Sequence, residues 1–314
     1  MSSLETLRFL FVTGKGGAGK TTISAALALA LANRGRNVLV AASREEDRLG
    51  TLLGAGPLGP EIAYVRPNIA GVQLVPEVAL REYGRLVLHS ERLVQALFDN
   101  RYVEGFFNGA PGLKEWALLG KAWYHSTETL ADGSPRFDTI VFDGPATGHG
   151  LDMLRVPKVI LSAAPPGRLR ADAERAFKSF QDPKTSGVVV VSLPEEMPTN
   201  ETLDLVSALT TDLELPIAEI VLNAALRPLF SQAEAAALEP FADHSGTEPG
   251  DVALSVAARR VLAERAQAES LERLRATGRR IRLVPRLFHG VSGYAATLEL
   301  SRHLLGAPAS PTTR

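Results

Sequence analysis

Short and nearly continuous apolar runs recur along this chain and alternate with longer segments of helical periodicity. Such runs are typical of strands that are buried on both faces of a sheet. Six of them are predicted as strands: Leu7–Thr13, Asn37–Ala42, Phe137–Asp143, Gly187–Ser192, Ala218–Asn223 and Ile281–Pro285. Helical patterns lie between most of them, for example at Thr21–Arg34 and Arg168–Phe180. The alternation predicts an α/β fold, a mainly parallel sheet with helices on both faces.

Two regions depart from this alternation. Residues 76–130 show no strand pattern after their start and contain both tryptophans, so they are predicted as a helical subdomain inserted into the α/β core. Residues 227–250 mix alanine with proline, glycine and acidic residues, which indicates a surface excursion. The last residues, 306–314, are predicted as a disordered tail. We therefore expect one α/β domain over residues 1–305.

Composition restricts the function classes. The 314 residues carry a formal net charge of -1, so no overall field attracts nucleic acid or anionic lipid, and no nucleic-acid partner is expected. The chain has no cysteine, which excludes disulfides and thiolate metal sites within it. Its N-terminus lacks the pattern of a signal peptide. The apolar helical run Ile23–Ala32 is about half the length that crosses a bilayer. A cytoplasmic protein without a membrane segment is predicted.

The segment Gly14–Thr21 reads G-K-G-G-A-G-K-T and lies between a predicted strand and a predicted helix, as the phosphate-binding P-loop motif requires. Its glycines let backbone N–H groups turn toward phosphates, and the helix N-terminus adds its positive dipole end. Lys20 would reach the β- and γ-phosphates, and the Thr21 hydroxyl would coordinate Mg²⁺. The sequence thus predicts ATP and Mg²⁺ as cofactors. The predicted nucleotide-binding residues here are Gly14, Lys15, Gly16, Gly17, Ala18, Gly19, Lys20, Thr21 and Thr22.

Asp143 ends an apolar strand run, the position from which a carboxylate binds magnesium in P-loop proteins. It is the second predicted metal residue beside Thr21. The following loop, Gly144–His149, is rich in glycine and proline and could move when the γ-phosphate is lost. His149 is interpreted as a loop-packing or hydrogen-bonding residue rather than a catalytic one.

Three motifs together, GKGGAGKTT, VFDGPATGHGLDML and a strand ending in Val221-Leu222-Asn223, carry a family resemblance. The chain resembles the arsenical-pump and tail-anchored-protein-targeting ATPases, a guided-entry type within the dimeric, deviant-Walker SIMIBI class of P-loop proteins. The resemblance extends from Leu7 to about Leu305. It is strongest to bacterial members, some of which occur as paired, unlike subunits.

The resemblance implies further roles. Lys15 would cross to the nucleotide of a partner subunit, which makes Lys15, Lys20 and Asp143 the implied catalytic residues; the alternative for Lys15 is a solvated loop lysine. Asn223 would hydrogen-bond the adenine, and the loop after Pro285 would lie against the base. Residues 145–148 would form the second switch loop. The implied partner is a second copy or a paralogous P-loop ATPase.

One departure from the family pattern bears on catalysis. Where such ATPases carry Asp-Pro-Ala, whose Asp orients the attacking water, this chain reads Ser43-Arg44-Glu45-Glu46. Arg44 stands in the place of that carboxylate, and a guanidinium cannot accept a proton from water. We therefore expect competent ATP binding with weak hydrolysis by this chain alone. A hydrolysis-poor regulatory subunit of a heterodimer, and a partition or septum-site ATPase, are the alternatives.

Two other surfaces have more than one interpretation. Trp116 and Trp123 share one face of a predicted helix, which would either pack the subdomain onto the core or open toward a protein client. Packing is favoured. Eight arginines between Arg259 and Arg282 are interleaved with glutamates, which favours a solvated helix with i,i+4 pairs over a nucleic-acid surface.

Overall fold

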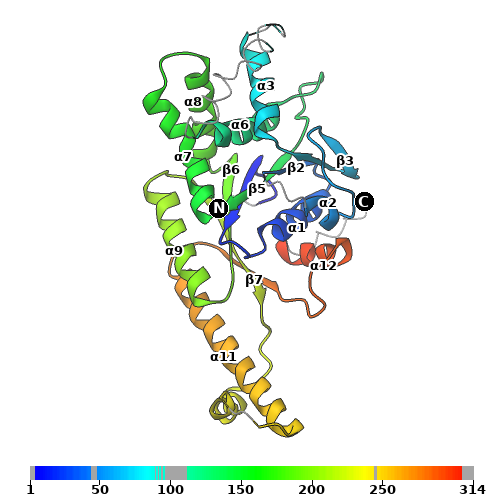
Figure 1. Ribbon diagram of the computed structural model, residues 1–314, viewed down its shortest axis with the longest axis vertical. Helices are drawn as coiled ribbons and strands as arrows, with labels where there is room; N and C mark the ends of the chain where they lie inside the picture. The colour runs from blue at the N-terminus through cyan, green and yellow to red at the C-terminus, as the bar shows by residue number, and fades with distance from the viewer. Residues whose placement is uncertain are drawn as a thin grey trace, which may run out of the picture.

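The computed structural model describes residues 4–43, 48–88, 112–243 and 246–305, together with Ser90, Arg92 and Gln95. Its centre is an eight-stranded sheet in the order β3-β4-β2-β5-β1-β6-β7-β8 (Figure 1). Neighbouring strands are parallel except for the pair β3 and β4. The strands are β1 Phe9–Gly14, β2 Val38–Ala42, β3 Ala63–Arg66, β4 Ile69–Gln73, β5 Thr139–Ala146, β6 Ser186–Ser192, β7 Ile217–Ala225 and β8 Ile281–Pro285.

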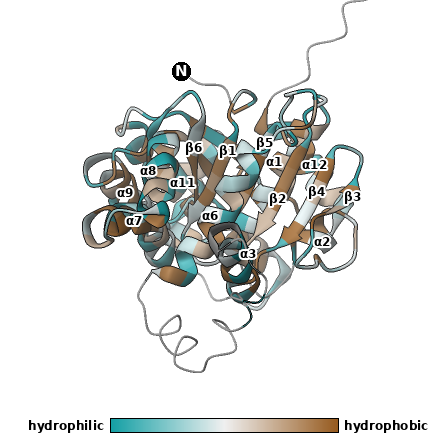
Figure 2. Ribbon diagram, turned by 90° about the horizontal axis from the view of Figure 1, so that it is seen from above, coloured by the Kyte–Doolittle hydropathy of each residue, from teal (hydrophilic) through white to brown (hydrophobic). Residues whose placement is uncertain are grey.

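Helices cover both faces of this sheet. Residues that alternate along β1 enter different cores: Phe9 and Phe11 pack with α6 to α9, whereas Leu10 and Val12 pack with α1, α2 and α12. Figure 2 shows apolar residues concentrated on the central strands between these helical layers. The predicted α/β fold class is confirmed. The helices are α1 Lys20–Ala32, α2 Leu49–Leu52, α3 Pro76–Leu88, α6 Leu113–Thr127, α7 Thr147–Ala163, α8 Arg168–Gln181, α9 Glu196–Thr211, α10 Gln232–Leu238, α11 Pro249–Arg275 and α12 Tyr294–Leu304.

All six predicted strands are present, as β1, β2 and β5 to β8, and the structure adds the hairpin of β3 and β4. The hairpin is absent from the prediction because β3 is largely exposed and β4 is interrupted by Gly71, so neither forms a long apolar run. Its turn is made by Pro67 and Asn68, and Asn68 has φ 61°. A proline followed by a residue that tolerates positive φ is a turn signal from which the hairpin could have been predicted.

The region between β4 and β5 contributes α3 and α6. Trp116 and Trp123 are both buried in the core between α6 and the sheet, so the packing interpretation of these rings is confirmed. The hydroxyl of Tyr83 on α3 donates a 3.0 Å hydrogen bond to Asp172 on α8. Burial and the adjacent Asp172 carboxylate raise the pKa of Tyr83 well above its usual value. The limits of the inserted subdomain stay a prediction, because most of residues 89–111 lie outside the described residues.

Within the described part of residues 227–250, α10 and the short 3₁₀ helix Glu239–Phe241 contain no buried residue, and α11 then runs back toward the sheet (Figure 1). On α11 the arginines pair with glutamates one turn away, Arg260 with Glu264 at 2.7 Å and Arg265 with Glu269 at 3.4 Å. The interpretation as a solvated helix holds for the arginines up to Arg275, whereas Arg279 and Arg280 follow the helix and Arg282 lies on β8 against the buried Glu219. None of the helices in the described part of the chain has both the length and the apolar character that crossing a membrane requires. The predicted tail, 306–314, lies outside the described residues.

Candidate functional site

The connection between β1 and α1 lies at the carboxyl end of the parallel strands. It turns through three glycines with positive φ, at 144° for Gly14, 82° for Gly17 and 92° for Gly19. The Ala18 amide donates a 3.2 Å hydrogen bond to the Lys15 carbonyl and closes the loop. Helix α1 starts directly afterwards, and the backbone amides of a helix's first turn have no partner within the helix and point out of its N-terminus, here toward the loop.

The glycines of this loop serve two purposes. A Cβ at Gly14 would lie 2.0 Å from the carbonyl oxygen of Val191, and one at Gly19 would lie 2.3 Å from the side-chain nitrogen of Asn223. These two positions are glycine because neighbouring strands approach them. Gly16 and Gly17 face no atom within 4 Å. The loop is therefore closed on its protein side and open on the other, which is the shape a phosphate chain needs.

Lys20 places a positive charge inside this loop. Its side chain is buried, and its ammonium donates a 2.9 Å hydrogen bond to the Lys15 carbonyl. A buried ammonium is costly unless polar or anionic partners surround it. The loop backbone supplies part of that environment. A phosphate bound against Gly16 and Gly17 would add negative charge to it.

Asp143 joins β5 to the first turns of α1. The carboxylate is 2% exposed and accepts hydrogen bonds from the Thr21 hydroxyl at 2.8 Å and the Ser24 hydroxyl at 2.9 Å. The Ser43 hydroxyl donates to the Asp143 carbonyl at 2.6 Å. Thr21 and Asp143 are the two predicted metal residues. They are far apart in the sequence, and the structure brings their side chains into direct contact.

Ser24 is a second hydrogen-bond donor to Asp143 that the sequence analysis missed. It follows Thr21 by three positions and so lies on the same helix face, which is the signal that could have identified it. These groups offer hard oxygen donors, which suit Mg²⁺. Among the described residues no three His, Cys, Asp or Glu side chains come together as a metal site. Mg²⁺ commonly keeps water and substrate phosphate oxygens among its ligands beside one or two carboxylates.

The predicted base-binding residues lie beside the loop on the next strands. The Asn223 side chain, on β7, donates a 2.8 Å hydrogen bond to the Ala18 carbonyl and so contacts the loop itself. Pro285 ends β8 and pairs with Ala225, two residues beyond Asn223. Thr22 lies within the first turn of α1. The structure thus brings Asn223 to the loop and places Pro285 at the neighbouring strand end.

Lys15 points toward its own chain. Its ammonium lies 2.5 Å from a carboxylate oxygen of Glu201 on α9. The second carboxylate oxygen of Glu201 accepts a 3.3 Å hydrogen bond from Thr147, the first residue of α7. This contact is not predicted from the sequence. Lys15 is interpreted there either as a solvated loop lysine or, by the family resemblance, as a lysine that reaches the nucleotide of a partner subunit.

The segment after Asp143 continues as strand to Ala146, and α7 begins at once with Thr147. The Thr13 hydroxyl donates a 3.1 Å hydrogen bond to the Pro145 carbonyl. His149 is exposed on the first turn of α7, so the loop-packing alternative is wrong, and the hydrogen-bonding alternative stays a prediction. The helix begins before the histidine and turns its side chain outward, while Gly150 lies against Thr13. Arg44 and its neighbours to Asp47 lie outside the described residues.

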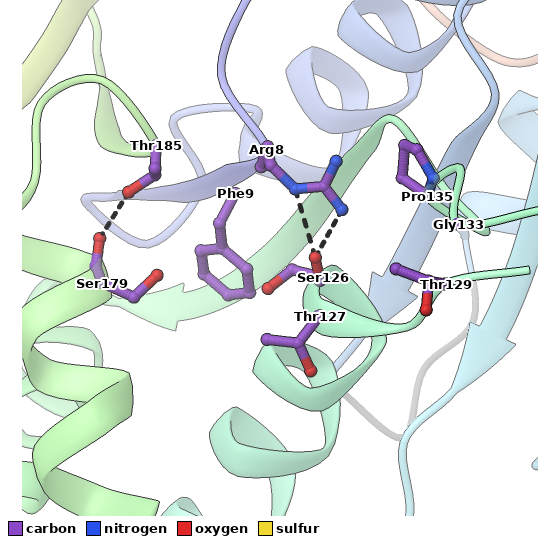
Figure 3. Close-up of a pocket in the computed structure, with 9 residues that line it drawn as sticks. All are labelled: Arg8, Phe9, Ser126, Thr127, Thr129, Gly133, Pro135, Ser179 and Thr185. Atoms are coloured by element: carbon purple, nitrogen blue, oxygen red, sulfur yellow. Dashed lines mark hydrogen bonds between the residues drawn. The ribbon is translucent and has the colours of Figure 1, made fainter.

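A cavity of about 430 Å³ lies elsewhere, at the amino ends of β1 and β6 (Figure 3). Arg8 occupies its side and donates from Nε and Nη2 to the carbonyl of Ser126, at 3.2 and 2.5 Å. None of the predicted site residues lines this cavity. The guanidinium therefore ties the end of α6 to β1, away from the P-loop.

Replacing Gly19 by alanine is expected to destabilise the protein by about 2 kcal/mol, because the new methyl group would meet Asn223 in a backbone conformation that alanine rarely adopts. Urea unfolding of the purified variant measures this. Gly16→Ala, in the same loop but facing open space, is the matched control and should leave the free energy of unfolding nearly unchanged. Equal effects of both substitutions would contradict the assignment of these two roles.

Comparison with known proteins agrees with this geometry. Residues 7–164 match the family model of the anion-transporting ATPases. The matched region contains the loop, Asp143 and α7.

Individual relatives are similar to this chain at modest identity. The ATPase BagA of Mycobacterium tuberculosis is 32% identical over 227 residues, which cover 71% of this chain and 66% of that protein. An arsenical pump-driving ATPase of Escherichia coli is 27% identical over 59% of this chain and 34% of its own length. ATPase GET3C of Arabidopsis thaliana is 25% identical over 71% of this chain and 68% of its own length. The chain thus spans less than two thirds of the length of these two bacterial relatives.

Proposed function

This chain belongs to the anion-transporting ATPase family, and we propose that it binds ATP with Mg²⁺ at the Gly14–Thr22 loop and hydrolyses it as one half of a dimer. The observation that carries the proposal is the contact of Thr21 and Ser24 with the buried Asp143 carboxylate, beside a loop that is open over Gly16 and Gly17. The proposed enzyme is a conformational switch. Its nucleotide state would act on a protein or membrane-associated partner in the cytoplasm.

Different residues of the site are proposed to bind the phosphates, the metal and the base. The loop amides and the start of α1 would bind the phosphates, and the Lys20 ammonium would neutralise their charge. Thr21 and Asp143 would hold Mg²⁺, which when bound neutralises phosphate charge and orients the γ-phosphate. Asn223 would bind the adenine, with the loop after Pro285 against the base. The Thr13 to Pro145 hydrogen bond links β1 to the segment that would respond to the γ-phosphate.

A dimer is proposed because Lys15 adds a second cation at a loop where Lys20 already supplies one. In this proposal Lys15 serves the nucleotide of the partner subunit, where charge develops during hydrolysis. The partner is a second copy or a paralogous P-loop ATPase. The region of α3 and α6 is proposed to face a protein client; because Trp116 and Trp123 are buried, these rings would not provide the contact in the conformation described.

The second candidate is a regulatory subunit that binds ATP and hydrolyses it poorly. Arg44 favours it, since the sequence places a guanidinium where relatives of this type carry the water-orienting carboxylate. Both candidates share the nucleotide site and differ in turnover. Adding a paralogue with an intact Asp-Pro-Ala distinguishes them.

The test combines ATP binding, turnover and oligomeric state of the purified chain. We expect Mg²⁺-dependent ATP binding, turnover below about 1 s⁻¹ for the chain alone, and a dimer that forms only with a slowly hydrolysed ATP analogue. Lys15→Ala should still bind ATP, while its dimer becomes about tenfold weaker. Lys184→Ala, an exposed loop lysine, is the control and should behave as the wild type. Absence of ATP binding would refute the proposal as a whole; ATP binding without a dimer would refute its second half.

A further inference from the structure

Glu201 connects three elements around the P-loop. One carboxylate oxygen lies 2.5 Å from the Lys15 ammonium, and the other accepts the hydrogen bond from Thr147. The contact joins residues 186 positions apart in the chain. It ties together the phosphate loop, the start of α7 and the helix α9.

The helix that carries the Glu201 carboxylate is anchored against the core. On α9, the next residue Thr202 and, one turn on, Leu205 are buried, so the helix that carries Glu201 is anchored by packing. The Lys15 and Glu201 side chains are 24% and 35% exposed, which leaves their pair only partly screened by water. The other acidic residues of α9, Glu196 and Asp204, are exposed.

A single ammonium cannot occupy two places. While Lys15 lies against Glu201, its charge is neutralised within its own chain and is withheld from any second nucleotide. To reach across a dimer interface, Lys15 has to leave Glu201, and the free energy of that ion pair is then subtracted from the free energy of dimerisation.

We infer that Glu201 is a positioning residue that holds Lys15 in its own chain and competes with the partner subunit's nucleotide for it. The inference rests on the proposed dimer. Thr147 contacts the other oxygen of the same carboxylate, so a shift of Glu201 when Lys15 leaves would reach the start of α7. In the chain without a partner subunit, the Glu201 carboxylate therefore keeps the charge of Lys15 neutralised.

The test is the dimerisation constant of the full chain with Mg²⁺ and a slowly hydrolysed ATP analogue, measured by sedimentation. Glu201→Gln keeps the size of the side chain and removes its charge, and should tighten the dimer about threefold, as expected for a partly exposed ion pair. Asp204→Asn removes the same charge from the same helix and should have no effect. In the Lys15→Ala background, Glu201→Gln should also have no effect, whereas a merely structural role of Glu201 would persist there.

A second measurement does not depend on the dimer. The rate at which an amine-reactive reagent modifies Lys15, followed by mass spectrometry on the monomer, should rise severalfold in Glu201→Gln and in Glu201→Ala. An unchanged rate and an unchanged dimer constant would overturn the inference and leave the proposed dimer standing. A wild-type chain that binds the analogue but never dimerises would overturn both.

Discussion

Replacing Asp143 by asparagine is expected to lower Mg²⁺-dependent ATP turnover by at least about 100-fold, because the metal's contribution to transition-state charge stabilisation amounts to several kcal/mol. The carboxylate is buried and contacts the Thr21 hydroxyl that shares the proposed metal site. Asparagine has nearly the same shape, so the substitution removes the charge and leaves the packing in place. Turnover measured against free Mg²⁺ concentration is the assay.

We expect a loss of ATP turnover in the Asp143→Asn variant that added Mg²⁺ does not restore. Nucleotide binding without the metal should be little changed, since the loop amides and Lys20 are untouched. Asp152→Asn, an exposed carboxylate on α7, is the control and should retain wild-type turnover. Chelation of Mg²⁺ in the wild type should reproduce the loss. Normal turnover of the Asp143 variant would remove this residue from the proposed metal site.

The part of this site that the sequence predicts is the part that is local in the chain. The loop Gly14–Thr21 follows one strand and begins one helix, so its glycines, Lys20 and the position of Thr21 can be interpreted from spacing alone. Asp143 could be assigned because it ends the predicted strand, although β5 continues to Ala146, and parallel strands bring their carboxyl ends to the same edge of the sheet. The structure places it in contact with Thr21.

Contacts that depend on packing between distant helices could not be predicted. Glu201 is one of several acidic residues of α9, and nothing in the local pattern distinguishes it from Asp204 until α9 is placed against the loop. The direction of Lys15 is a further example. The family resemblance implies a role at a second nucleotide, whereas the place of Lys15 in the single chain depends on a carboxylate 186 positions away.

Burial in the structure also corrects interpretations that rested on side-chain chemistry alone. The glycine-rich segment predicts a loop in which His149 packs or forms a hydrogen bond, yet helix α7 begins at Thr147 and exposes its side chain. Trp116 and Trp123 share a helix face that sequence periodicity shows well. Whether that face meets the sheet or solvent depends on where α6 lies, and it meets the sheet.

Replacing Glu219 by alanine is expected to destabilise the protein by about 3–5 kcal/mol, because it leaves a partly buried guanidinium without its partner. Glu219 lies on β7 and is 1% exposed. Both of its oxygens accept hydrogen bonds from Arg282 on β8 at 2.6 Å, and Arg280 approaches at 2.8 Å. A thermal shift of about 10 °C downward follows for a chain of this size.

Two further variants distinguish the effect of the Glu219 charge on stability from the effect of its packing. Glu272→Gln, at an exposed position of α11, should leave the melting temperature unchanged. The double substitution Glu219→Leu with Arg282→Leu should recover much of the loss, since an apolar pair of similar volume avoids the desolvation of two charges. A Glu219 variant as stable as the wild type would show that the ion pair contributes little.

The Glu219 pair also bears on the nucleotide site. Asn223 lies four residues further along β7, and Pro285 lies three residues beyond Arg282 on β8, so the ion pair links the two strands that carry the proposed base-binding residues. In a folded Glu219→Ala protein, ATP affinity should therefore fall more than affinity for tripolyphosphate, which has no base. An equal fall in the affinities for ATP and tripolyphosphate would mean that the ion pair does not affect the part of the site proposed to bind the base.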